Sequence, residues 1–271
     1  MTIRSRARPA GREEIIGAEM LEGLQVEERP ADGALRLTGW EARDPTIVCG
    51  ITTPALGDYV VGGAPAARVT ERYGDLARRL GFDRVSVPAQ IHGIEIREAA
   101  TRSGTRGTVP RVERAGRIDG QVTSARGCLL AATAADCVPV SLWNPGAERI
   151  GLIHAGWRGA AAGILRRALP RLLEVAGGSA GDLRVHFGPA ICGRCYEVDT
   201  PVLAAFGFAG DRARLDLRGL LAAQALEAGV DRGAISTSRH CTACGPSRLH
   251  SHRASGGEAG RMAAFLGLLR D

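Results

Sequence analysis

Hydrophobic and polar residues alternate along the chain with periods that predict both helices and strands. Residues 65–81, PAARVTERYGDLARRLG, carry apolar side chains at helical spacing, a proline suited to a first turn and a closing glycine. This pattern predicts an amphipathic helix. Residues 215–230 predict a second helix, ended by Gly229, and we interpret the apolar run EAGRMAAFLGLLR at 258–270 as a last helix.

Short runs rich in β-branched residues predict strands between these helices. TIVCGITT at 46–53 predicts a buried strand, and a turn at 31–33, Ala-Asp-Gly, joins two short extended pieces before it. Surface loops are expected at 101–117, which is rich in Gly and Arg, and at 242–257. Further extended segments are predicted at 84–96, at 182–187 before a Gly-Pro loop, and at 234–241.

The stretch 117–159 organises the rest of the chain. Two apolar runs, at 128–134 and 148–155, lead to the ionisable side chains of Cys137 and His154. WNPG between the runs is a turn signal, because Pro fixes φ and Gly tolerates positive φ. GWRGAAAGILRRAL follows at once with helical spacing, so we expect the thiol and the imidazole at a strand-to-helix junction.

The helix that follows starts near Gly159, and its pattern is interrupted or kinked at Pro170 and ends at Gly177-Gly178. Strands and helices therefore intermingle without the strict strand–helix–strand rhythm of a doubly wound parallel sheet. A chain of 271 residues can bury a substantial core within a single domain, here preceded by a weakly patterned segment over 1–40.

Composition and charge are those of an ordinary globular protein, with 45% hydrophobic and 24% charged residues. The net charge of +6 is spread over scattered arginines, which disfavours nucleic-acid binding and suits a small anion such as phosphate. The basic N-terminus has no apolar core behind it and no run is long enough to span a bilayer, so we expect a cytoplasmic protein without a membrane partner. In that compartment the seven cysteines are thiols or metal ligands rather than disulfides.

Three separated residues, His92, Cys137 and His154, offer the chemistry of a metal site. Two imidazoles and one thiolate suit Zn²⁺, and three protein ligands leave a fourth position for water or substrate. Each residue also has a simpler interpretation, since a lone buried Cys is usually a small hydrophobe and a lone His is usually a hydrogen-bonded structural residue.

Two C-x-x-C pairs, Cys192/Cys195 and Cys241/Cys244, leave two interpretations open. Together they form a structural zinc site with four cysteine ligands, although the 45 residues between the pairs far exceed the spacing of a zinc knuckle. Alternatively, each pair belongs to a separate block of sequence that tolerates cysteine.

Six blocks occur in a fixed order: QIHG, DGQVT, AADCVPV, GLIHAGWRG, GPAI with CYEV, and CTAC with HSHR and GRMAAF. They extend from Gln90 to the C-terminus, about two thirds of the chain. Together they resemble the laccase-domain family, also called multicopper polyphenol oxidase-like. Members of that family have been described as purine nucleoside phosphorylases with adenosine deaminase activity.

The resemblance implies an α+β fold of mixed β-sheets flanked by helices, in a domain over 41–271 that holds one Zn²⁺ per chain. It places the zinc ligands on His92, Cys137 and His154. It also implies phosphorolysis of adenosine-, inosine- and guanosine-type nucleosides and hydrolytic deamination of adenosine, with purine nucleosides and phosphate as partners. The other expected site residues are Asp136 and Arg158 as catalytic groups, and Arg72, Gln90 and Asp119 as substrate-binding groups.

The N-terminal third departs from the family's pattern. The family's Gly-Gly-x-Ser element and Asn-Arg pair are replaced by TTPALGDYVVGG and Glu71-Arg72, so Arg72 lacks its usual neighbour. In the tail, Leu249-His250 replace an aromatic pair, which alters the purine contact expected from that loop.

Two roles have alternatives at this stage. Asp136 would either shuttle protons or cap the local backbone, and Arg72 and Arg158 are the candidate phosphate anchors, although Arg158 would equally brace the start of a helix.

Rival functions start from the same residues. A polyphenol oxidase dependent on Cu²⁺ requires several copper ions with mostly imidazole ligands, and the chain has six histidines. A metal-free hydrolase would use Cys137 as its nucleophile and a histidine as the base. The intact ligand set argues against a purely partner-binding role.

Overall fold

Seven strands form the larger of two main β-sheets. The computed structural model describes residues 15–24, 28–62, 64–99, 110–174, 178–246 and 249–270. The sheet has the strand order β2 (Glu28–Ala31), β3 (Ala34–Leu37), β4 (Ile47–Thr52), β16 (Met262–Leu268), β9 (Cys128–Ala134), β5 (Arg84–Val87) and β7 (Arg111–Arg114). β5 runs parallel to both of its neighbours, and the other pairs are antiparallel.

Six strands form the second main sheet. Their order is β15 (Ile235–Thr237), β12 (Arg184–Phe187), β10 (Val138–Asn144), β11 (Arg149–Ala155), β8 (Gly120–Thr123) and β6 (Ile96–Glu98). The outer pairs, β15 with β12 and β8 with β6, are parallel, and the central pairs are antiparallel. Both main sheets are therefore mixed, as the α+β prediction requires.

A small sheet and six α-helices complete the described part of the fold. The small sheet has the order β1 (Ile15–Ile16), β14 (Arg212–Leu215) and β13 (Glu197–Asp199). The helices are α1 (Thr38–Glu41), α2 (Ala66–Arg79), α3 (Trp157–Ala161), α4 (Ile164–Leu173), α5 (Thr200–Ala205) and α6 (Leu217–Glu227).

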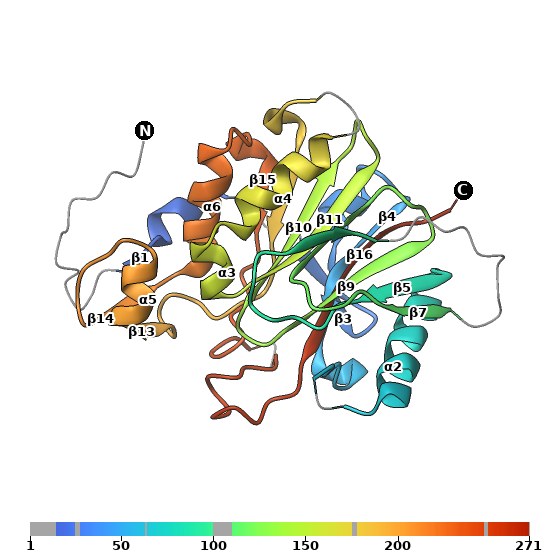
Figure 1. Ribbon diagram of the computed structural model, residues 1–271, viewed down its shortest axis with the longest axis horizontal. Helices are drawn as coiled ribbons and strands as arrows, with labels where there is room; N and C mark the ends of the chain where they lie inside the picture. Colours follow the sequence, from blue (N-terminus) through green and yellow to red (C-terminus); the bar gives the residue numbers. More distant parts are fainter. Residues whose placement is uncertain are drawn as a thin grey trace.

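The two main sheets pack face to face, and helices cover the outer side of each (Figure 1). Trp143, Ile150 and Leu152 of the six-stranded sheet meet Leu130 and Leu266 of the seven-stranded sheet in one buried cluster. α3, α4 and α6 share a second cluster with the outer face of the six-stranded sheet, and α2 shares a third with the seven-stranded sheet. The result is a helix–sheet–sheet–helix sandwich.

The central strands of this sandwich are buried on both faces. In β16, Phe265 packs on the side of α2, whereas Leu266 packs between the two sheets. A strand of this kind needs apolar residues at every position, so its sequence lacks the alternation that identifies a half-exposed strand. The interpretation of 258–270 as a helix is therefore wrong, because a short run with no polar face looks the same in either structure.

Several other sequence predictions are confirmed. α2 lies within the predicted helix at 65–81 and ends before Gly81, which has φ 84°. α6 ends before Gly229, at φ 92°, as its pattern indicates. The predicted turn at 31–33 joins β2 to β3, with Asp32 and Gly33 both at positive φ, 50° and 79°.

Two element boundaries differ from the prediction. The helix after residue 156 breaks at Gly163, which adopts φ 84° between α3 and α4, and not at Pro170, which lies inside α4. Residues 111–114, expected in a surface loop, form β7 at the edge of the seven-stranded sheet. Residues 101–109 of that expected loop and Gly177 of the expected helix end lie outside the described residues.

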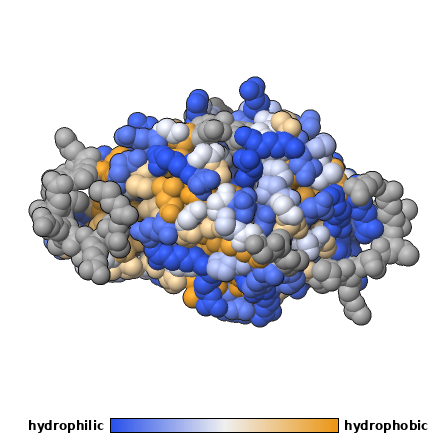
Figure 2. All heavy atoms as spheres, turned by 90° about the horizontal axis from the view of Figure 1, so that it is seen from above, coloured by the Kyte–Doolittle hydropathy of each residue, from blue (hydrophilic) through white to orange (hydrophobic). Residues whose placement is uncertain are grey.

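Polar side chains dominate the face of the molecule shown in Figure 2, with apolar groups visible in patches between them. Among the described residues, Ile91 is the one large apolar side chain classed as exposed, at 42%. No described helix combines the length and the apolar character needed to cross a membrane.

Candidate metal centre

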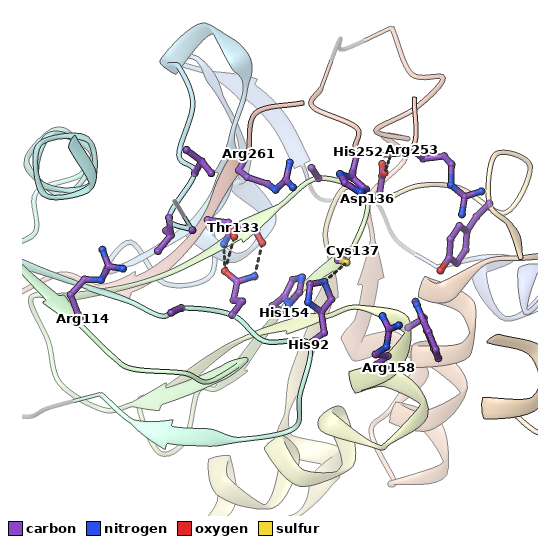
Figure 3. A pocket seen from close by; sticks show the side chains of 18 residues that line it. His92, Arg114, Thr133, Asp136, Cys137, His154, Arg158, His252, Arg253 and Arg261 are labelled. Atoms are coloured by element: carbon purple, nitrogen blue, oxygen red, sulfur yellow. Dashed lines mark hydrogen bonds between the residues drawn. The ribbon is translucent and has the colours of Figure 1, made fainter. Parts of the chain in front are cut away.

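Three segments that are distant in sequence bring His92, Cys137 and His154 to one point (Figure 3). Cys137 lies in the short connection through which the chain passes from β9 in one main sheet to β10 in the other. His154 is near the end of β11, just before α3, and His92 lies in the loop between β5 and β6. Sγ of Cys137 is 3.9 Å from Nε2 of His92, and the three ligand atoms lie within 4.8 Å of one another.

The carboxylate of Asp119 holds two of these segments in place from behind. It accepts hydrogen bonds from the backbone N–H groups of Ile91 at 3.2 Å, His92 at 2.9 Å and Gly93 at 2.7 Å. It also accepts one from Nδ1 of His154 at 2.9 Å, which leaves Nε2 of that ring to face the centre. Burial raises the pKa of Asp119, but the hydrogen bonds from His154 and Gly93 outweigh it and leave the pKa below its usual value. Metal-binding histidines are usually oriented in this way, by a carboxylate that accepts a hydrogen bond from the second ring nitrogen.

Cys137 and His154 stabilise each other's charged forms. Burial raises the pKa of the Cys137 thiol, but the neighbouring imidazoles of His154 and His92 outweigh it and lower the pKa to about 6. Burial lowers the pKa of His154, and the Cys137 and Asp119 charges reverse this and raise it to about 9. Without a metal, the pair is therefore a thiolate beside an imidazolium at neutral pH, and a cation would replace the imidazolium proton.

The glycines of the HAGWRG block allow the loop of His92 to approach the start of α3. A Cβ atom on Gly156 would lie 2.7 Å from Cδ2 of His92 and 3.1 Å from Sγ of Cys137. A Cβ atom on Gly159 would lie 2.8 Å from the backbone oxygen of Gly93. Any larger residue at 156 would occupy the space of the ligand side chains themselves.

The centre lies in the wall of a cavity of about 660 Å³ (Figure 3). Its lining combines arginine side chains from several parts of the chain with the aromatic residues Trp157 and Tyr196. The arginine, histidine and aspartate residues of the lining, beyond the triad, are Arg114, Asp136, Arg158, His252, Arg253 and Arg261. With four arginines and one aspartate, the lining carries an excess of positive charge.

Asp136 and Gln90, two predicted site residues, line this cavity and also fix its walls. Asp136 accepts hydrogen bonds from the Thr242 hydroxyl and from the backbone N–H of Arg253, the latter at 2.7 Å. Gln90 donates to the backbone oxygen of Thr133 at 2.8 Å and accepts from the backbone N–H and hydroxyl of the same residue. The bonds to Asp136 come from residues more than 100 positions away, so neither capping of the local backbone nor proton transfer is decided by them, and both roles stay predictions.

The remaining predicted residues are placed differently from one another. Arg158 lines the cavity, with its guanidinium 4.2 Å from the ring centroid of Trp157. Arg72 is not part of the lining, because it projects from α2 toward Gly57 in a separate groove. Asp119 is buried behind the histidines and orients them, so it does not face the cavity.

Sequence reasoning missed the contributions of Arg114, Tyr196, His252, Arg253 and Arg261 to the cavity. Four of them were within reach, because CYEV, HSHR and GRMAAF contain Tyr196, His252, Arg253 and Arg261. Arg114 gave no signal, since it lies in a segment that was expected to be a surface loop. In the tail, Leu249 is buried in the cluster between the sheets and does not line the cavity.

The donor set fits a borderline metal ion such as Zn²⁺. It provides one thiolate and two imidazoles, and the cavity leaves room for a fourth ligand. All six histidines lie in the described part of the chain, and no cluster of three or more potential ligands there contains more than two of them. That count does not match a multicopper cluster built mostly on imidazoles.

Several known proteins are similar to this chain. A family model described as "Multi-copper polyphenol oxidoreductase laccase" matches residues 55–269. "Purine nucleoside phosphorylase YlmD" of Bacillus subtilis is 35% identical over 55% of this chain, which spans 58% of that protein's length. "Adenosine deaminase RL5" from an unknown prokaryotic organism is 30% identical over 79% of this chain and 86% of its own. The crystal structure of YlmD from Geobacillus stearothermophilus superposes with a TM-score of 0.75 at 30% identity, covering 91% of this chain and 99% of that one.

Removal of one donor should empty the centre. We expect Cys137→Ser and His154→Ala each to lose the equivalent of metal held here, because the loss of an outer-shell partner alone typically weakens metal binding about 10- to 100-fold. Elemental analysis after dialysis measures this, with Arg167→Ala on the exposed side of α4 as the control. Retention of the full wild-type metal content in both variants would contradict the assignment.

Gly156→Ala tests the close approach of the His92 loop. The backbone of Gly156, at φ −75° and ψ 168°, is open to alanine, so the substitution acts only through the added methyl group. We expect displacement of His92 and a metal affinity weaker by at least about tenfold, with the fold retained. Gly233→Ala is the matched control because no atom lies within 4 Å of its Cβ position. Equal affinities in the two variants would show that the space is not limiting.

Metal affinity at this centre should rise with pH. Binding needs the Cys137 thiolate and neutral His154, and between about pH 6 and about pH 9 only the imidazolium proton must leave. Metal affinity should therefore fall by about tenfold for each unit by which the pH is lowered in that window. Below about pH 6 it should fall more steeply, because the Cys137 thiolate also binds a proton there. Competition titration with a chelator measures the slope, with Cys137→Ser as the blank. A flat profile between pH 7 and pH 8.5 would exclude the proposed ion pair.

Proposed function

The chain belongs to the multi-copper polyphenol oxidoreductase laccase family, and we propose that it is a zinc enzyme of purine nucleosides. The proposed reactions are phosphorolysis of adenosine-, inosine- and guanosine-type nucleosides and hydrolytic deamination of adenosine. One observation carries the proposal: the His92, Cys137 and His154 donors open into a cavity whose walls supply both positive charge and aromatic rings. The names of the relatives support the same substrate class.

His92, Cys137 and His154 would hold Zn²⁺ in the wall of the cavity. When bound, the ion would act as a Lewis acid and lower the pKa of a water molecule toward neutrality. The chain's own contribution is positional. Asp119 fixes the His154 ring through its Nδ1 hydrogen bond and fixes the His92 loop through three backbone bonds. The donors are thus in place before a ligand arrives.

The aromatic residues of the cavity would contact the base of a nucleoside. Tyr196 lies 5.3 Å from the guanidinium of Arg253, measured to the ring centroid, and Trp157 lies beside Arg158. Planar rings backed by guanidinium groups suit the face of a purine. Adenosine bound with C6 toward the triad would present that carbon to water. The water oxygen would bond to C6 as the bond from C6 to the amino nitrogen breaks. One proton of the water would leave with ammonia, and the other would stay on the inosine that forms.

Phosphorolysis requires an anion site beside the sugar. In that reaction a phosphate oxygen bonds to C1′ as the bond from C1′ to the purine nitrogen breaks, which yields the free base and ribose 1-phosphate. Arg158 is the favoured anchor, because its guanidinium faces the cavity and no described carboxylate pairs with it. Arg253 is partly committed, since it donates to the backbone oxygen of Glu197 at 2.9 Å. Arg72 has no place in this proposal, because it lies outside the cavity.

Asp136 would handle protons in either reaction. It adjoins Cys137 in sequence and lines the cavity, and each of its carboxylate oxygens accepts one hydrogen bond from the protein. A carboxylate oxygen has a second acceptor position, so both oxygens retain the capacity to bind a proton from substrate or water.

A metal-free cysteine hydrolase is a second candidate, favoured by one specific arrangement. The thiolate of Cys137 lies beside the imidazole of His154, and the carboxylate of Asp119 orients that imidazole from its other side. This is the arrangement of a nucleophile with its base. A hydrolase of this kind has no use for His92, the second imidazole in contact with the thiolate. A chelator distinguishes the two hypotheses, because it would abolish the activities of a zinc enzyme and leave the activity of a metal-free hydrolase unchanged.

Product identity tests the proposal directly. Zinc-loaded protein with adenosine should form inosine without phosphate, and in ¹⁸O-labelled water the label should appear in the inosine base. Adenine or hypoxanthine together with ribose 1-phosphate should appear only when phosphate is added. If no nucleoside reacts and a phenol is oxidised after copper loading, the protein is a polyphenol oxidase and the proposal of a purine nucleoside enzyme fails.

The cytoplasmic location expected from the sequence stays a prediction.

Arginine variants should separate the two reactions. Arg158→Ala should raise the phosphate concentration needed for half-maximal phosphorolysis by at least about tenfold, since a charged hydrogen bond is lost. Deamination should change far less, because it consumes no phosphate. Arg167→Ala on α4 is the exposed control, and Arg72→Ala examines the anchor expected from sequence. An equal loss of both activities in Arg158→Ala would assign Arg158 to the scaffold.

A further inference from the structure

Four cysteines outside the cavity form a second cluster. Cys192, Cys195, Cys241 and Cys244 place their sulfur atoms within 4.8 Å of one another. All four are free thiols in the structure, and Sγ of Cys192 is 3.9 Å from Sγ of Cys244. The 45 residues between the two pairs argued against a joint site, so the fold must explain how they meet.

Parallel strand pairing brings the two pairs together. β12 and β15 lie side by side with Phe187 opposite Thr237, and each leaves the sheet in the same direction. The pairing resumes beyond the strands at a bridge between Ala190 and Cys241, where the N–H of Thr242 donates to the backbone oxygen of Ala190 at 3.1 Å. Each strand then runs directly into its own C-x-x-C turn. The separation in sequence is therefore the length of a crossover between neighbouring parallel strands.

Both turns are shaped before any ion arrives. In the first, the N–H groups of Cys195 and Tyr196 donate to the backbone oxygen of Cys192 at 2.9 and 3.0 Å. In the second, the N–H of Gly245 donates to the backbone oxygen of Cys241 at 3.1 Å, and this oxygen leaves no space for a side chain at 245.

A charged pair braces both turns from behind. Asp216 accepts from the N–H of Gly193 at 3.0 Å, and Arg218 donates to the backbone oxygen of Ser238 at 2.8 Å, just before the second turn. The two side chains also contact each other at 3.4 Å. The turns are linked as well, since the N–H of Cys192 donates to Sγ of Cys241 at 3.2 Å.

The spacing of the sulfur atoms matches tetrahedral coordination. Thiolates about 2.3 Å from a tetrahedral zinc ion lie roughly 3.8 Å apart, close to the separation of Cys192 and Cys244. A disulfide would require a distance near 2.05 Å between two of them. Four sulfur donors also close the coordination shell, which leaves no position for water or substrate and characterises a structural site.

We propose that Cys192, Cys195, Cys241 and Cys244 bind a second, structural zinc ion that clamps one wall of the cavity. The first turn leads directly into Tyr196, which lines the cavity. In the second turn, the Thr242 hydroxyl donates to Asp136, next to Cys137. The N–H of Ile191 donates to the backbone oxygen of the same Asp136 at 3.1 Å. The clamp therefore holds the peptide that carries the thiolate of the first centre.

Metal analysis of the full chain purified in the presence of zinc tests this site. Wild-type protein should hold two equivalents, and Cys195→Ser/Cys244→Ser should hold one, with the Cys137 centre still filled. Cys137→Ser should also hold one, and its X-ray absorption spectrum should contain a shell of sulfur atoms alone at about 2.3 Å. Cys49→Ala, which removes a thiol buried elsewhere, should keep both equivalents.

The proposal fails if the double variant keeps the wild-type zinc content, or if the metal in Cys137→Ser has nitrogen or oxygen ligands. Iron in place of zinc, or disulfides between these cysteines in the purified protein, would also overturn it. Because the absorption measurement uses Cys137→Ser, it decides the question even if the double variant does not fold.

Hydrogen exchange tests the clamp. Chelation of the metal in Cys137→Ser should increase amide exchange in 191–197 and 241–246 by at least about tenfold, with β9 and β11 unchanged. Exchange that is unaffected by chelation would show an ion that does not hold the wall.

Discussion

A single buried carboxylate, that of Asp119, sets the geometry on which the rest of the centre depends. A charge without solvent contact is costly unless donors surround it, and Asp119 has four, three from the His92 loop and one from His154. The loop must therefore keep the conformation that points these N–H groups inward, including φ 59° at His92. Because the same carboxylate orients the ring of His154, the backbone that carries His92 and the imidazole of His154 are positioned by one group.

The second constraint is the fixed relation of the two main sheets. Cys137 lies on the connection from β9 to β10, and the loop of His92 connects β5 to β6, so each of these two ligands is carried by a link between the sheets and depends on how the sheets are aligned. Apolar packing alone would tolerate some sliding, but buried polar contacts do not. The Gln121 side chain on β8 accepts from the Ser86 hydroxyl on β5 and donates to the backbone oxygen of Ala131 on β9 at 3.0 Å. These directional bonds lock the register of the sheets beside the centre.

Sequence patterns identified the parts of this fold whose signals are local. The helix α2 has an apolar stripe beside a polar face, and the turn at 31–33 has Asp and Gly, which tolerate positive φ, and both were predicted correctly. β16 was mistaken for a helix because burial on both faces removes that alternation, and the α3–α4 break depends on Gly163 rather than on the more conspicuous Pro170. For the site, residue chemistry singled out His92, Cys137 and His154, which the fold brings together. The hydrogen bonds of Asp119 were not foreseen, because three of its four donors are backbone N–H groups that no sequence pattern displays. The exclusion of Arg72 and the inclusion of Arg114 depend on how separate strands meet, which a single chain does not reveal.

The backbone of Asp136 has a consequence for how ligands act on one another. This residue has φ 95°, an energetically unfavourable conformation for a side chain other than glycine, immediately before Cys137. Hydrogen bonds from Ile191, Thr242 and Arg253 offset that strain, and the Arg253 bond comes from the tail loop that lines the cavity. A ligand that contacts the tail loop in the cavity would therefore also stabilise the peptide that carries the thiolate. Because free-energy coupling of this kind is reciprocal, a metal ion bound to that thiolate would stabilise the observed position of the tail loop in turn.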